Sequence, residues 1–107
     1  MKPLLLGTII VLATATAAAA AADDLSKSQA GHVYAETYCS KCHSIGAGPS
    51  PLEQAPRFKD VAEQSGVTAM SLQAFLQSSH PTMPNIILEP EDMRNVIAYI
   101  LSLKGRE

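Results

Sequence analysis

The sequence is poor in cysteine, in positive charge and in strand-forming patterns, and each shortage excludes a class of protein. It holds two cysteines among 107 residues, so at most one internal disulfide can form. Eight Lys and Arg residues stand against ten Asp and Glu, and this balance argues against a nucleic-acid-binding protein. No strands alternate with helices, and no strand pair is joined by a hairpin turn. The sequence therefore predicts an all-α protein with long loops that prolines stiffen.

Residues 1–22 have the composition of a secretory signal peptide. A basic start is followed by an apolar run over residues 4–13 and by an alanine-rich tract that ends at Ala22. We expect cleavage there, which leaves residues 23–107 as the mature domain, with a formal charge of 7 − 10 = −3, in an oxidising compartment. The alternative stays open that residues 4–22 are retained as a membrane anchor, because they are just long enough to span a bilayer.

Apolar periodicity predicts up to four helices in the mature domain. The expected helices are residues 28–42, residues 57–64, a third that Thr68 or Ser71 caps and that ends at Ser78 or Ser79, and a fourth that starts at Pro90. In the fourth, apolar residues recur at i, i+3, i+4, i+7 and i+8 from Met93. Pro90 suits the first helical position, whereas Glu89 is a poor N-cap. So small a domain buries too little surface to be stable alone. We therefore expect a disulfide, a metal ion or a cofactor to stabilise its core.

The stretch CSKCHSI, from Cys39 to Ile45, places two thiols and an imidazole within five residues. A thioredoxin-like redox pair needs a βαβ context, a structural zinc site needs a fourth ligand, and a disulfide across two residues stabilises little. C-x-x-C-H is also the attachment signature of c-type haem. In that interpretation Cys39 and Cys42 bond to the two vinyl groups of one porphyrin, because their spacing of nearly one helical turn brings both sulfurs to one side. His43 then becomes an axial ligand of the iron.

A haem bound to one histidine has a second axial face, and Met83 is the best candidate for it. Met83 lies between two prolines in the irregular stretch HPTMPNIILEP and has no periodic apolar face to join. Met70 and Met93 fall on helical patterns, and we interpret them as packing residues. His80 is the rival ligand, and a bis-histidine site would lower the reduction potential that a methionine ligand raises.

These features resemble class I cytochrome c, the small monohaem electron carrier, over almost all of residues 28–104. The matching stretches are GHVYAETYCSKCH, SPLEQAPRF, HPTMPNIIL and PEDMRNVIAYILSLK, in that order. The resemblance implies three to four helices wrapped around one covalently attached haem c. It also implies that Gly31 lets the first and last helices cross closely, with Tyr99 packed at the crossing.

The resemblance assigns a hydrogen-bond partner to His43 as well. In the family, the carbonyl of a loop proline accepts a hydrogen bond from the ring nitrogen that does not face the iron, which fixes the ring. Pro51 is expected to supply that carbonyl here, and Pro49 is the second candidate.

The implied function is one-electron transfer in the periplasm, without enzymatic catalysis. Partners would be redox proteins met transiently at the exposed porphyrin edge, with no stable membrane insertion after cleavage. Four basic residues near the attachment site either form a local basic rim or are ordinary solvated charges: Lys27, Lys41, Arg57 and Lys59. Two alternatives stay open, namely an electron-transfer subunit of a periplasmic dehydrogenase and a haem enzyme or ligand sensor in which Met83 is displaced.

Overall fold

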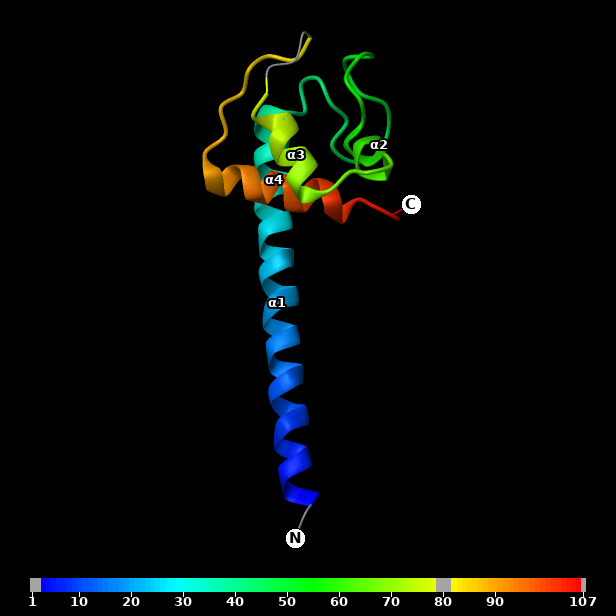
Figure 1. Ribbon diagram of the computed structural model, residues 1–107. Helices are drawn as coiled ribbons and strands as arrows, with labels where there is room; N and C mark the ends of the chain where they lie inside the picture. The colour runs from blue at the N-terminus through cyan, green and yellow to red at the C-terminus, as the bar shows by residue number, and fades with distance from the viewer. Residues whose placement is uncertain (1–2, 79–81, 107) are drawn as a thin grey trace.

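A computed structural model describes residues 3–78 and 82–106, and side chains from residue 15 onward. These residues form four helices and no strand: α1 (Pro3–Tyr38), α2 (Phe58–Glu63), α3 (Ala69–Leu76) and α4 (Pro90–Ser102). The end of α1 packs with the other helices and their loops into a head, residues 28–78 and 82–106, while the start of α1 projects away as a stalk (Figure 1). The all-α class predicted from the sequence is confirmed.

Helix α1 has 36 residues and is therefore about 54 Å long. It begins earlier than the predicted helix over residues 28–42, because the alanine-rich tract has the highest helix propensity of any composition. It also ends earlier, at Tyr38, where the amides of Cys39 and Ser40 both donate to the Ala35 carbonyl and the regular pattern of i to i−4 hydrogen bonds stops. Among the described residues, no helix carries a stretch long and apolar enough to cross a membrane. Cleavage of residues 1–22 stays a prediction.

Helices α1 and α4 cross at Gly31, where the resemblance placed their close approach. A Cβ atom added to Gly31 would lie 1.9 Å from the Asn95 carbonyl oxygen and 2.9 Å from Cβ of Tyr99. Tyr99 is 8% exposed and packs at this crossing, with its ring against His32. Only a residue without a side chain allows the α4 backbone to come so near.

Helix α4 begins as its sequence predicts. Pro90 occupies the first turn, followed by Glu91 and Asp92, which favour the positive end of the helix dipole. Glu89 is the N-cap and makes no side-chain capping hydrogen bond. The apolar face is buried and consists of Met93, Val96, Ile97, Tyr99 and Ile100.

The two short helices occupy the predicted positions with shorter bounds. Helix α2 lies inside the predicted range of 57–64. Thr68, rather than Ser71, is the N-cap of α3, and the two residues form a capping box in which each side chain accepts from the other's amide. Helix α3 ends at Leu76, two to three residues before the predicted end.

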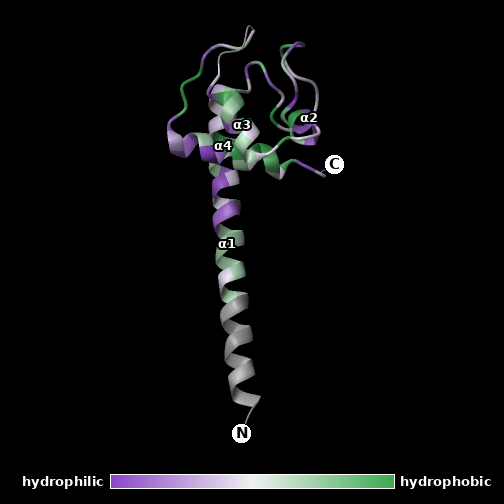
Figure 2. Ribbon diagram, viewed as in Figure 1, coloured by the Kyte–Doolittle hydropathy of each residue, from purple (hydrophilic) through white to green (hydrophobic). Residues whose placement is uncertain are grey.

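The buried core is small for a domain of this length. Its apolar members are Ala35, Phe58, Ala62, Leu72, Met93, Val96, Ile97, Tyr99 and Ile100. Figure 2 shows hydrophobic segments on α3, on α4 and along the loop that leads into α4. Several of these side chains turn toward an open interior space, so the helices do not close on one another.

The Gly31 contact predicts a sharp cost for adding one methyl group. Gly31→Ala forces Cβ against a backbone carbonyl that cannot rotate away, and overpacking of this kind costs about 1–3 kcal/mol. This exceeds the ~1 kcal/mol that alanine gains over glycine in helix propensity. The free energy of unfolding, measured with guanidinium chloride, should therefore fall.

Gly46→Ala is the matched control, because a Cβ at Gly46 meets nothing within 4 Å. Its free energy of unfolding should stay within about 0.5 kcal/mol of the parent value. Equal stability of the Gly31 and Gly46 variants would show that the crossing does not depend on glycine.

Candidate functional site

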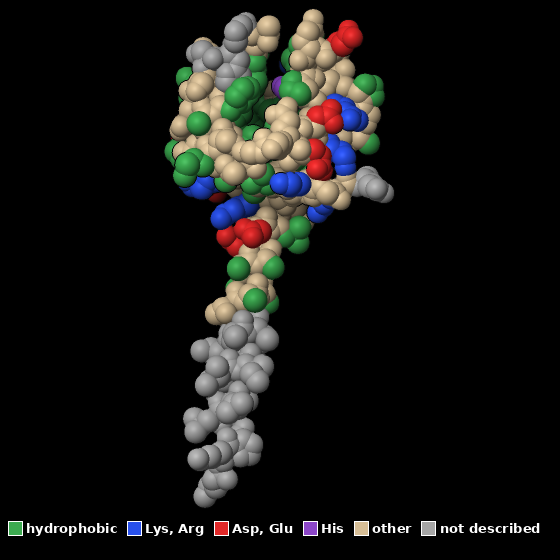
Figure 3. All heavy atoms as spheres, turned by 45° about the vertical axis from the view of Figure 1, so that its right-hand side comes forward, with side chains coloured by type: hydrophobic (Ala, Val, Ile, Leu, Met, Phe, Trp, Pro, Cys, Tyr) green, Lys and Arg blue, Asp and Glu red, His purple; other side chains and the backbone are tan. Residues whose placement is uncertain are grey.

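An apolar cavity of about 410 Å³ occupies the interior of the head. It is visible as a hollow between hydrophobic side chains (Figure 3). Its volume falls within the range of cofactor sites, about 300–1,000 Å³. Its walls include Tyr34, Cys39, His43, Phe58, Val61, Leu72, Phe75, Leu76, Met83, Ile86, Leu88, Val96 and Ile100. All four helices, the turn after α1 and the segment before α4 therefore contribute to one cavity.

The turn after α1 brings both cysteines and His43 to the cavity region. The amides of Cys42 and His43 donate to the Cys39 carbonyl at 3.2 and 3.0 Å. Cys39 and His43 line the main cavity, while Cys42 and His43 line a neighbouring space of about 310 Å³. The sequence predicted this gathering from spacing alone, although it assigned the turn to a helix.

The cysteines do not have the environment of a redox pair or a zinc site. Burial, and secondarily the neighbouring Cys42, raises the pKa of the Cys39 thiol, whereas reactive cysteines have a lowered pKa. The two thiols are not joined in a disulfide. In the described part of the chain, no three His, Cys, Asp or Glu side chains gather closely enough to hold a metal ion by themselves.

The His43 ring is fixed by a backbone carbonyl and an aromatic ring. Its Nδ1 lies 2.6 Å from the Pro56 carbonyl oxygen, and its ring centroid lies 5.3 Å from that of Phe58. A carbonyl can only accept, so Nδ1 carries the proton, and in the neutral ring Nε2 is the nitrogen with the lone pair. Orientation of this kind prepares an imidazole to bind a metal through Nε2.

The expected partner, Pro51, was wrong, and so was the second candidate, Pro49. The reason is a pair of backbone hydrogen bonds between residues far apart in the loop. The Leu52 amide donates to the Cys42 carbonyl at 3.1 Å and the Phe58 amide to the Ser44 carbonyl at 2.9 Å, which folds the loop back on itself. This brings Pro56 against His43. Pro56 lies in the stretch that carried the resemblance, but nothing local distinguishes its carbonyl from those of the other prolines.

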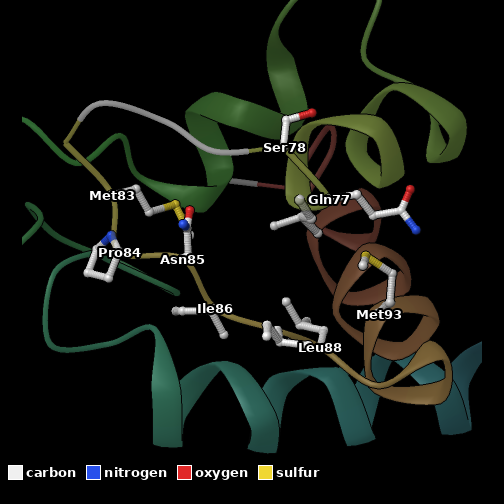
Figure 4. A pocket seen from close by; sticks show the side chains of 10 residues that line it. Gln77, Ser78, Met83, Pro84, Asn85, Ile86, Leu88 and Met93 are labelled. Atoms are coloured by element: carbon white, nitrogen blue, oxygen red, sulfur yellow. The ribbon is translucent and has the colours of Figure 1, made fainter.

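Met83 is the methionine that shares the cavity with His43. Both residues line the main cavity and the smaller space beside it. Figure 4 shows an adjoining pocket of about 430 Å³, where Met83 comes from the irregular segment and Met93 from α4. Met93 is buried in the core as predicted. The interpretation of Met70 as a packing residue was wrong, because its side chain is 81% exposed. His80, the rival ligand, lies outside the described residues.

The residues present fit a haem. The walls are largely apolar, as a porphyrin requires, and the cavity holds one imidazole with a free Nε2 and one thioether. Cys39 is at the wall, with Cys42 one turn along the chain. Phe58 and the α3 side chains, which the sequence did not single out, complete the enclosure.

Comparison with family models identifies the class of protein. The model described as "Cytochrome c" matches residues 28–104, which is 77 of the 107 residues. The chain belongs to the cytochrome c family, as the sequence predicted. Comparisons with curated proteins and with solved structures found no significant match.

Family membership establishes the cofactor and the coarse function. Cytochrome c domains bind haem c covalently through a C-x-x-C-H motif, and Cys39, Cys42 and His43 have that spacing. The family indicates haem-based electron transfer, and its domains usually work outside the cytoplasm.

The site predicts that covalent attachment depends on both cysteines. Cys39→Ala with Cys42→Ala should give a chain whose intact mass lacks haem. Because the cavity occupies the interior of the head, this chain should also lose cooperative thermal unfolding, measured by circular dichroism. Lys41→Ala, between the two cysteines, is the control and should keep the haem mass. A double variant that unfolds cooperatively without haem would show that the apolar core is sufficient for folding without the cofactor.

Proposed function

We propose that the protein is a periplasmic monohaem electron carrier in which His43 and Met83 are the two axial ligands of the haem iron. The observation that supports this most directly is that both side chains line one apolar cavity, with the His43 ring held by the Pro56 carbonyl. When bound, the haem supplies one-electron chemistry, with the iron alternating between the ferrous and ferric states.

The chain's own residues would tune and protect this centre. A methionine ligand raises the reduction potential relative to a second histidine, and apolar walls keep water from the metal. His43 keeps its tautomer through Nδ1, so its Nε2 stays available to the iron. With His43 and Met83 both bound to the iron, the protein would leave no position for a substrate. This favours a carrier over an enzyme or a ligand sensor.

Export of the domain is part of the proposal. Residues 1–22 have signal-peptide composition, and cytochrome c domains usually work outside the cytoplasm. Cleavage after Ala22 would remove most of the stalk and leave the part of α1 that crosses α4.

The proposed partners are other redox proteins, bound transiently over two segments that flank the site. These segments are residues 46–56 and 82–88, of which residues 52, 54–56 and 82–84 line the space beside Cys42 and His43. Glu53 is the single charged residue in these two segments of the sequence. Ile87 is 91% exposed. This surface favours docking through apolar contact.

Two of the four basic residues, Arg57 and Lys27, are less suited to docking. Arg57 makes a bidentate ion pair with Asp60, and the Arg57 hydrogen bond lowers the pKa of that carboxyl. Lys27 pairs with Asp23 at 2.9 Å and lines a groove between α1, α3 and α4. Neither residue is set beside the haem cavity as a free charge, so we favour the interpretation that they are ordinary solvated charges.

Methionine ligation predicts a specific spectral loss. Met83→Ala should keep covalent haem, lose the weak methionine–iron absorption band at the red end of the ferric spectrum, and lower the reduction potential. The ferrous variant should also bind carbon monoxide readily, because one axial position opens. Absorption spectra and potentiometric titration measure these changes.

Met70→Ala is the matched control, since Met70 is 81% exposed and lies outside the cavity walls. It should keep the band and the potential. If the spectrum of Met83→Ala equals that of the parent and His80→Ala changes it, the ligand is His80. Ready carbon monoxide binding by the parent protein would favour the sensor alternative.

Docking through apolar contact predicts a weak salt dependence. Electron self-exchange between ferrous and ferric copies uses the same surface and can be measured by NMR line broadening without knowing the partner. Between about 0.01 and 0.15 M ionic strength the Debye length falls from about 30 to 8 Å, yet the rate should change less than about threefold. Ile87→Ser should slow it, whereas Val33→Ser should not, because Val33 is also exposed, at 62% against 91% for Ile87, but lies on α1. A steep salt dependence would point to charge-steered docking.

A further inference from the structure

Tyr99 connects the helix crossing to the backbone that follows His43. Its hydroxyl donates a hydrogen bond to the Ile45 carbonyl, 54 positions away in the sequence. On the other side, the Tyr99 ring meets α1, with its centroid 5.0 Å from that of His32 and its Cβ close to Gly31. One buried side chain of α4 therefore contacts both α1 and the segment next to the proposed iron ligand.

The segment that receives this hydrogen bond is already held on its other sides. The Ser44 amide donates to Ser50 Oγ at 3.0 Å, and the Ser44 carbonyl accepts from the Phe58 amide at 2.9 Å. Ser44 is 7% exposed. The hydrogen bond to the Ile45 carbonyl is thus one of several that determine where residues 43–45 lie.

A second route runs through the aromatic rings. Phe58 lies between the other two rings, with its centroid 5.3 Å from that of His43 and 6.4 Å from that of Tyr99. Phe58 is 6% exposed, so its ring fills a fixed space. A change in the Tyr99 position would move Phe58 and, through it, the imidazole.

We propose that Tyr99 is a positioning residue for His43, acting through its hydrogen bond to the Ile45 carbonyl and through the Phe58 ring. The inference rests on the proposed function, because it takes His43 as an iron ligand. Burial raises the pKa of the Tyr99 hydroxyl, which keeps the donor protonated at neutral pH. The orientation of the imidazole is then coupled to the packing of α4 on α1.

The test is Tyr99→Phe in the haem-loaded protein. This change keeps the buried ring that packs at the crossing and removes only the hydroxyl, so the variant should fold and keep covalent haem. The Ile45 carbonyl loses a hydrogen bond that contributes about 1 kcal/mol to the free energy of unfolding. Hydrogen exchange at the Phe58 amide, which bonds to the neighbouring Ser44 carbonyl, should therefore be about fivefold faster. The hyperfine-shifted proton resonances of the His43 ring and the reduction potential should both move.

Tyr38→Phe is the matched control, because it removes the hydroxyl of a tyrosine that is 58% exposed on α1. Its His43 resonances, reduction potential and Phe58 exchange should equal those of the parent. The inference is overturned if Tyr99→Phe loses overall stability but keeps parent values for these readouts, since Tyr99 is then a packing residue alone. A parent protein with haem but no hyperfine-shifted His43 ring would instead contradict the proposed function.

Discussion

The contact between Gly31 and the backbone of α4 is the constraint on which the head depends. It determines how far α4 lies from α1, and α4 supplies Val96 and Ile100 to the cavity wall. The same approach brings Tyr99 within reach of the Ile45 carbonyl. Backbone contact of this kind cannot be adjusted by a rotamer change, so the distance between the helices is set by covalent geometry.

The core and the cavity share their residues. Four of the nine buried apolar residues, Phe58, Leu72, Val96 and Ile100, also line the cavity. Their buried surface on the cavity side has no protein partner to meet. A domain this small cannot compensate by burying apolar area elsewhere. Filling the cavity with a flat apolar cofactor therefore stabilises the fold and creates the functional site at the same time.

The sequence predicted those features that depend only on residues close together in the chain. The apolar period of α4, the Thr68 cap, the C-x-x-C-H spacing and the isolation of Met83 between prolines all depend on neighbouring residues. The carbonyl partner of His43 could not be predicted in this way. It depends on the Leu52–Cys42 and Phe58–Ser44 backbone hydrogen bonds, which fold the loop and join residues ten and fourteen positions apart. The contribution of α3 to the cavity wall could not be predicted either. In the sequence, Leu72 and Phe75 have the spacing of ordinary core residues, and only the assembled helices place them at the cavity.

The two proposed iron ligands are held by different kinds of interaction. His43 is oriented by a hydrogen bond at Nδ1 and by the Phe58 ring, both present in the protein alone. Around Met83, the segment 82–88 turns Ile86 and Leu88 toward the cavity, so its placement relies on apolar packing. Hydrogen bonds are directional, whereas apolar packing depends on what fills the space. The chain's own groups therefore orient the imidazole, whereas the placement of the thioether depends on what fills the cavity.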